Sequence, residues 1–127
     1  MTFPAAVPEL PVTSIDTAAN YYVAVLGFTL DWGGDGGGIA GISRGQCRLF
    51  LTDPSFREHY RTAGPVLFWL NLDGKTAVDE LHAQWKAAGA KIVSDPDDTP
   101  WKLHEFTASD RDGNLIRVFY DFRRDQQ

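Results

Sequence analysis

Apolar and polar positions follow a similar pattern in two successive blocks of the chain, and each block predicts one helix among short strands. The first block opens with an apolar strand from Ala6 to Val12. A helix is expected from about Asp16 to Leu26, because Ser14 or Asp16 can cap its start and Gly27 can end it. Three short strands complete the block, separated by glycine-containing loops: Phe28–Trp32, Ile39–Arg44 and Cys47–Thr52.

The second block repeats this order. A strand from Val66 to Leu72 precedes a helix from about Lys75 to Ala88, which Gly89 ends. Asp112-Gly113-Asn114 is a turn signal between the last two strands. The three short strands of this block are predicted at Lys91–Val93, Leu103–Ala108 and Leu115–Tyr120.

The pattern therefore predicts an α+β fold of two β-α-β-β-β modules, at about residues 6–52 and 65–120, within a single domain of residues 1–127. The polar linker between them, 53–64, is expected to hold one helical turn around Phe56–Tyr60. One module alone would leave sheet edges uncovered, so the two modules are expected to pack together. In the second helix, Val78, Leu81, Trp85 and Ala88 recur every three or four residues, which predicts a core position for Trp85.

The strands have two different faces. Alternate residues form one apolar face that suits packing against helices, as in Phe68 and Leu70. The other face mixes aromatic with charged and polar side chains: Phe50, Trp69 and Phe119 beside Glu9, Arg48, Asn71 and Arg117. A concave, partly wet surface with a few polar groups is typical of a small-molecule site. The alternatives are a dimer interface or a second core held by salt bridges.

Composition narrows the classes of function. The 127 residues carry a net charge of −5 with dispersed basic residues, which disfavours nucleic-acid binding and would weakly attract a cationic ligand. No stretch reaches the roughly 18 apolar residues of a membrane span, and no cationic leader opens the chain, so a cytoplasmic location is expected. Cys47 is the only cysteine, which excludes an internal disulfide and favours a buried, inert thiol.

Four segments resemble the vicinal oxygen chelate superfamily, which includes glyoxalases, extradiol dioxygenases and bleomycin-binding proteins. They are AVPELPVTSIDTAANYYVAVLGFTLDW, RLFLT, VLFWLNLD with the following helix, and DTPWKLHEF…SDRDGNLIRVF. The motifs AVP, LGFTLDW and PW-x-x-x-EF are most similar to the bleomycin-resistance branch.

This resemblance implies a U-shaped, mostly antiparallel sheet around a cleft, in a homodimer that exchanges N-terminal strands about a hinge at Pro8. It also implies that grooves at the dimer interface hold an antibiotic without modifying it. Trp32, Phe50, Trp69 and Trp101 match aromatic or lining positions of that groove, and we add Asn71 and Arg117 from the mixed sheet face as candidate ligand-binding residues.

The positions that hold a metal in enzymes of the superfamily read here as Val7, Phe50, Leu67 and Arg117. Three of these side chains have no donor atom and the fourth is a permanent cation, whereas a divalent metal needs carboxylates, imidazoles or similar donors. The three histidines, at 59, 82 and 104, share no recognised ligand spacing. We therefore expect no metal and no cofactor.

The sequence favours binding over catalysis and leaves alternatives open. The first hypothesis is a homodimer that sequesters a planar, cationic ligand such as a bleomycin-family antibiotic. A carboxylate from the acidic loop Asp95–Asp98 would meet the cationic part, or the loop is simply solvated. The second is a lyase, isomerase or dioxygenase-like enzyme with a displaced or absent metal, in which Glu9 or Glu105 acts as a base near Arg117 rather than pairing with it. A third is a binding module for another metabolite.

Overall fold

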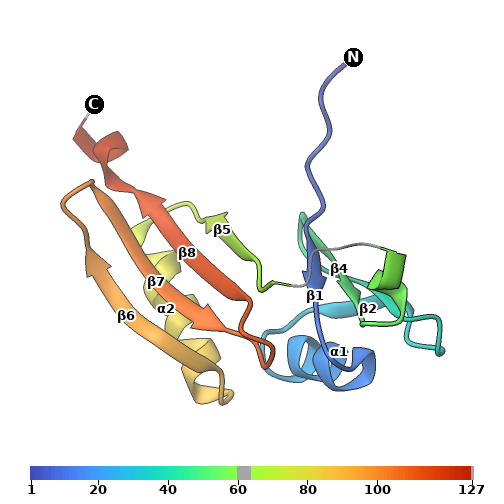
Figure 1. The fold of residues 1–127 in the computed structure, drawn as a ribbon. Coiled ribbons are helices and arrows are strands. Elements are labelled where there is room, and N and C mark those ends of the chain that lie inside the picture. Colours follow the sequence, from blue (N-terminus) through green and yellow to red (C-terminus); the bar gives the residue numbers. More distant parts are fainter. Residues whose placement is uncertain (60–63, 127) are drawn as a thin grey trace. The chain divides into compact units, whose positions relative to one another are not determined.

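The computed structural model describes residues 1–59 and 64–126, and it divides into two compact units, Met1–Val66 and Leu67–Gln127. Each unit contains one helix and four strands in the order β-α-β-β-β (Figure 1). This confirms the α+β fold with two repeated modules. Among the described residues, no helix is long and apolar enough to cross a membrane.

The first unit builds a mixed sheet in the order β1-β4-β3-β2. Strand β1 runs parallel to β4, and the other neighbours are antiparallel. The elements are β1 (Glu9–Pro11), α1 (Ile15–Ala24), β2 (Thr29–Gly33), β3 (Ile39–Arg44), β4 (Cys47–Thr52) and the 3₁₀ turn η1 (Phe56–His59).

Local signals fix the ends of α1. The Ser14 hydroxyl accepts a hydrogen bond from the Thr17 amide at 3.3 Å and so satisfies one of the free donors of the first turn. Gly27 adopts a φ of 80° just beyond the helix, a conformation in which glycine avoids steric cost. Both features confirm predictions from the sequence. The fully buried Tyr22 ring then packs edge-to-face on Phe28 at 5.5 Å and anchors the helix to the strands.

The second unit repeats the topology in the order β5-β8-β7-β6, with β5 parallel to β8. The elements are β5 (Leu67–Asn71), α2 (Lys75–Ala87), β6 (Lys91–Asp98), β7 (Leu103–Ser109), β8 (Leu115–Asp121) and the 3₁₀ turn η2 (Phe122–Gln126). Helix α2 contacts β6, β7 and β8 and lies along one face of this sheet (Figure 1).

The core of the second unit lies between α2 and the sheet. Trp85 is 1% exposed and contacts Phe106 edge-to-face at 5.8 Å, which confirms its predicted core position. The Asp110–Asn114 turn is held from within, because Asp110 Oδ1 accepts hydrogen bonds from the amides of Asp112 and Asn114. Gly113 supplies the positive φ that this predicted turn requires.

Five predictions need correction or qualification. Strand β1 is shorter than Ala6–Val12, and β6 is longer than Lys91–Val93. The segment Asp95–Asp98 is therefore part of a strand rather than a loop, and Pro96 is accommodated because β6 is an edge strand with irregular register. Cys47 is half-buried, and burial raises the pKa of its thiol. Tyr60, the expected end of the linker turn, lies outside the described residues.

Candidate functional site

Each sheet has one face against its helix and one face that carries the predicted mixture of aromatic and charged side chains. In β8, Ile116 and Val118 are fully buried, while Arg117 and Phe119 between and beside them are only half-buried. This alternation follows the period of two in a strand. We call the second faces the open faces, defined by Trp32, Phe50 and Arg48 in the first unit and by Trp69, Phe119 and Arg117 in the second.

In the first unit, Trp32 from β2 and Phe50 from β4 meet edge-to-face at 5.2 Å across the intervening strand β3. The Arg48 guanidinium lies 5.9 Å from the centre of the Phe50 ring, within the range of a cation–π contact. Trp32 is 42% exposed although its indole is large and apolar. Two predicted site residues, Trp32 and Phe50, are thus brought together.

The intervening strand makes room for the indole with a glycine. A Cβ atom on Gly41 would lie 2.4 Å from Trp32 Nε1, closer than any real contact. Gly41 is the register partner of both Trp32 and Phe50, so the indole lies directly over this position. The absence of a side chain at residue 41 is therefore what allows the Trp32–Phe50 contact.

In the second unit, Trp69 from β5 meets Phe119 from β8 edge-to-face at 5.5 Å. The Arg117 guanidinium lies 5.0 Å from the centre of the Trp69 ring. Trp69 and its neighbour Leu67 are each 43% exposed. Trp69 and Arg117, both predicted site residues, share this open face.

The strand registers relate the two faces residue by residue. Phe50 is paired with Glu9 on the parallel neighbour and with Gly41 on the antiparallel one, and Phe119 is paired in the same way with Asn71 and Glu105. Phe50 and Phe119 are therefore equivalent, and so are Arg48 and Arg117, each two residues earlier. By the same relation, Glu105 on β7 occupies the position in the second unit that Gly41 on β3 occupies in the first.

Two polar atoms on the open face of the second unit, Glu105 Oε2 and Arg117 Nε, are buried and have no hydrogen-bond partner in the part of the chain that the structure describes. Neither Glu105 nor Arg117 forms an ion pair within 4.0 Å with a described residue. The predicted ion pair between these two side chains is therefore absent. Glu9, the other candidate partner, accepts a hydrogen bond from Thr52 Oγ1 at 3.2 Å in the first unit.

The remaining predicted site residues differ in their surroundings. Asn71 lies on β5, and its amide nitrogen donates to the carbonyl oxygens of Leu72 at 3.1 Å and Phe119 at 3.4 Å. That amide therefore supports the junction of β5 and β8. Trp101 lies in the turn between β6 and β7, is 56% exposed, and makes no ring contact with another described residue.

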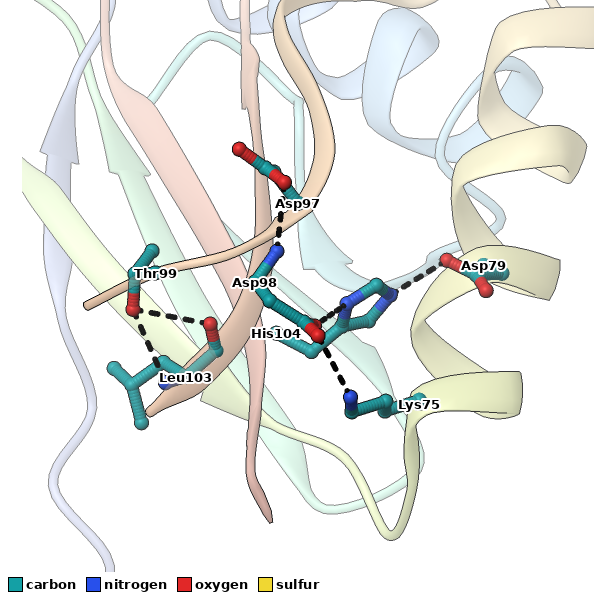
Figure 2. A network of polar contacts seen from close by, with 7 residues as sticks. All are labelled: Lys75, Asp79, Asp97, Asp98, Thr99, Leu103 and His104. Carbon is teal, nitrogen blue, oxygen red and sulfur yellow. Dashed lines mark hydrogen bonds and ion pairs between the residues drawn. The ribbon is translucent and has the colours of Figure 1, made fainter. Parts of the chain in front are cut away.

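A polar network on the helix side of the second sheet was not predicted from the sequence. His104 on β7 lies between two carboxylates, with 2.7 Å from Nε2 to Asp79 of α2 and 2.7 Å from Nδ1 to Asp98 of β6 (Figure 2). An ionised carboxylate oxygen accepts a hydrogen bond, and a histidine ring nitrogen donates one when it carries a proton. Lys75 at the start of α2 donates to Asp98 at 2.9 Å and closes the network.

This network joins α2 to strands β6 and β7. The hydrogen bond from Lys75 and then that from His104 lower the pKa of Asp98 below its ordinary value. A second contact of the same kind, from His82 of α2 to Asp95 of β6 at 3.1 Å, lies beside it. The partners are up to 25 residues apart in sequence, so no local motif signals them.

The described residues include no group of three or more histidine, cysteine or acidic side chains arranged to hold a metal ion. The resemblance described above aligns four residues of this chain with metal-binding positions. They are three apolar side chains and one guanidinium: Val7, Phe50, Leu67 and Arg117. These side chains do not suit a divalent metal, because none of them offers a carboxylate, imidazole or similar donor atom.

Comparison with known proteins agrees with this fold. Solved structures with the same fold include a glyoxalase/bleomycin resistance protein/dioxygenase from Nocardioides, with 19% identity, a TM-score of 0.76 and coverage of 94% of this chain and 85% of that one. TioX from Micromonospora sp. ML1 shows 24% identity and a TM-score of 0.75, over 92% and 98% of the two chains. Lactoylglutathione lyase from Agrobacterium tumefaciens shows 21% and 0.76, over 91% and 92%.

Identities this low establish similarity of fold alone. No curated protein sequence matches the chain. The family model of the Glyoxalase/Bleomycin resistance protein/Dioxygenase superfamily matches residues 5–118, which include every strand and both α-helices up to Val118 in β8. The repeated β-α-β-β-β topology and this match together place the chain in the Glyoxalase/Bleomycin resistance protein/Dioxygenase superfamily.

Proposed function

We propose that the protein is a homodimeric, metal-independent binding protein that sequesters a planar, cationic small molecule, such as a bleomycin-family antibiotic, without modifying it. The observation that carries the proposal is the half-exposed tryptophan on each open face, held edge-to-face on a phenylalanine: Trp32 on Phe50 and Trp69 on Phe119. An indole held in this way offers a rigid flat surface for stacking.

The physical chemistry of these faces suits a flat ligand. Exposed aromatic side chains bury apolar area when a planar ring stacks on them, and each such stack contributes about 1–3 kcal/mol. The phenylalanine beneath each indole restricts its orientation, which lowers the entropy lost on binding. The net charge of −5 favours the approach of a cationic ligand. Because an arginine lies beside each aromatic pair, the cationic part of the ligand is expected to contact acidic side chains away from the rings.

The arrangement of the N-terminus suits an exchanged arm. The expected first strand forms backbone hydrogen bonds with β4 only from Pro8 onwards, and residues 1–6 are exposed, including Phe3. An exposed segment of this kind can cover a second copy of the chain, as the swapped strand of the bleomycin-resistance branch does. We therefore include the homodimer in the proposal.

The test is a titration of the purified protein with bleomycin, followed by tryptophan fluorescence, with elemental analysis of the same sample. We expect saturation at one ligand per subunit without stoichiometric metal. Trp69→Ala or Trp101→Ala should weaken binding by about 10- to 100-fold, because each removes a stacking surface. Val93→Ala is the control, since Val93 is also exposed in the second unit but is not aromatic. Unchanged affinity in both tryptophan variants would contradict the proposal.

A second candidate function is supported by one observation, the unpartnered Oε2 of Glu105 on the open face. A carboxylate oxygen whose lone pairs no hydrogen bond occupies can accept a proton from a substrate placed within reach of it. This candidate is an enzyme of the superfamily that acts as a lyase, isomerase or dioxygenase-like protein. Stoichiometric bound metal after purification, or product formation that Glu105→Gln abolishes, would favour it over sequestration.

A further inference from the structure

We infer that the ligand of the open face in the second unit presents a neighbouring hydrogen-bond acceptor and donor, as an aryl carboxamide does, with Arg117 donating to the acceptor and Glu105 accepting from the donor. The inference rests on the proposed binding function and specifies the chemical class of the ligand. It follows from two buried polar atoms that have no hydrogen-bond partner among the described residues.

Arg117 brings an unused donor to the stacking surface. Its guanidinium lies 5.0 Å from the centre of the Trp69 ring, while its Nε has no hydrogen-bond partner in residues 1–59 and 64–126. A buried donor left in this state costs about 1–3 kcal/mol. A planar molecule stacked beside Trp69 can place an oxygen against this nitrogen and remove that cost.

Glu105 brings an unused acceptor to the same face. Its partner in the adjacent strand is Phe119, while Arg117 is paired with Thr107, so Glu105 and Arg117 are diagonal neighbours. Diagonal neighbours on adjacent strands are about 7–8 Å apart at Cα, within reach of long side chains. These two described side chains form no ion pair, and a group between them that offers an acceptor to Arg117 and a donor to Glu105 would satisfy both buried atoms.

The charges of the two residues select the class of group. A carboxylate would be attracted by Arg117 but repelled by Glu105. An ammonium group would be attracted by Glu105 but repelled by Arg117. A neutral carboxamide satisfies both atoms without either repulsion, and it is coplanar with an attached aromatic ring. The first unit lacks this selectivity, because Gly41 stands where Glu105 stands in the second.

The experiment compares three probes that share one ring system: 2-naphthamide, 2-naphthoate and 2-naphthylmethylammonium. Dissociation constants are measured by calorimetry on the full-length protein. We expect 2-naphthamide to bind most tightly. In Glu105→Gln the ratio of amide to carboxylate affinity should fall at least about tenfold, because glutamine no longer repels naphthoate and can donate to it.

Arg117→Met provides an independent second variant and should move the preference towards the ammonium probe. Glu80→Gln is the matched control, since it removes the same charge from an exposed position on α2 and should leave the order of the probes unchanged. Circular dichroism verifies that each variant is folded.

Equal affinity for the three probes, binding of none of them, or the same ratio in Glu105→Gln and Arg117→Met as in the unaltered protein would overturn the inference. The bleomycin titration judges the proposed function separately. Saturable binding of bleomycin together with any of these results would reject the carboxamide specificity while leaving sequestration in place.

Discussion

The two units share one backbone plan but present different open faces. Both carry phenylalanine and arginine at equivalent register positions, Phe50 with Arg48 and Phe119 with Arg117. The tryptophan reaches the phenylalanine from opposite edges of the sheet, from β2 in the first unit and from β5 in the second. One repeated fold can thus form two distinct binding surfaces when a single large side chain changes strands.

The central position of each face completes the difference. In the first unit Trp32 covers Gly41, which leaves a purely apolar centre. In the second unit the equivalent position holds Glu105, whose Oε2 is buried and has no hydrogen-bond partner among the residues described. The first face is therefore suited to stacking alone, whereas the second combines stacking with a hydrogen-bond requirement.

The helix sides differ as well. Helix α1 has a side-chain cap from Ser14, whereas Gly74 at the start of α2 offers none. Helix α2 is instead joined to the outer strands by the contacts of His104 with Asp79 and Asp98. The second unit thus uses polar tertiary contacts where the first uses a local cap.

The largest effect is expected from a side chain that fills the space beneath Trp32, because this space distinguishes the first open face from the second. Gly41→Val should displace the indole from Phe50 and destabilise the protein by about 1–3 kcal/mol, the usual range for overpacking. Denaturant unfolding gives the change in free energy, and a shift in tryptophan emission reports the displaced ring.

The equivalent change in the second unit is the matched control. Glu105→Val removes a buried acceptor that no described residue donates to, so its effect on stability should be close to zero or stabilising. Equal destabilisation by Gly41→Val and Glu105→Val would show that the two centres do not differ as described.

A smaller effect is expected from the polar network on α2. Because the pKa of Asp98 is lowered in the folded state, its contribution to stability is fully present above the ordinary pKa of an aspartate and is lost as the pH falls through the lowered value. Asp98→Asn should therefore lower the Tm by a few degrees at most at pH 7, since the contact is exposed.

Thermal unfolding from pH 7 to pH 2 measures this difference. The Tm values of the unaltered protein and Asp98→Asn should converge at the acidic end, where the carboxyl of Asp98 is protonated. A difference that stays constant over the whole range would show that the charge of Asp98 contributes nothing to stability.

Much of this fold follows from local sequence signals. Ser14 and Gly27 bracket α1, and the spacing of Val78 and Trp85 identifies the buried side of α2, because caps and periodicity act over a few residues. The extent of β6 could not be predicted, since Pro96 and three aspartates argue locally against a strand that pairing with β7 nevertheless imposes.

The open faces were predictable as sets of alternating residues, but their contacts were not. The covering of Gly41 by Trp32 depends on strand register, and so does the position of Glu105 beside Phe119. The contacts of His104 likewise depend on how α2 lies on the sheet. Register and packing arise from tertiary structure, which a pattern of apolar and polar residues does not specify.

The most direct test of the central claim follows the four indole N–H signals by two-dimensional ¹H–¹⁵N NMR during a titration with bleomycin. Trp85 is buried in the core and serves as the internal reference. Binding to the open faces predicts that the signals of Trp32 and Trp69 shift with increasing ligand while that of Trp85 stays in place. Saturable binding that leaves both Trp32 and Trp69 unshifted would contradict the account.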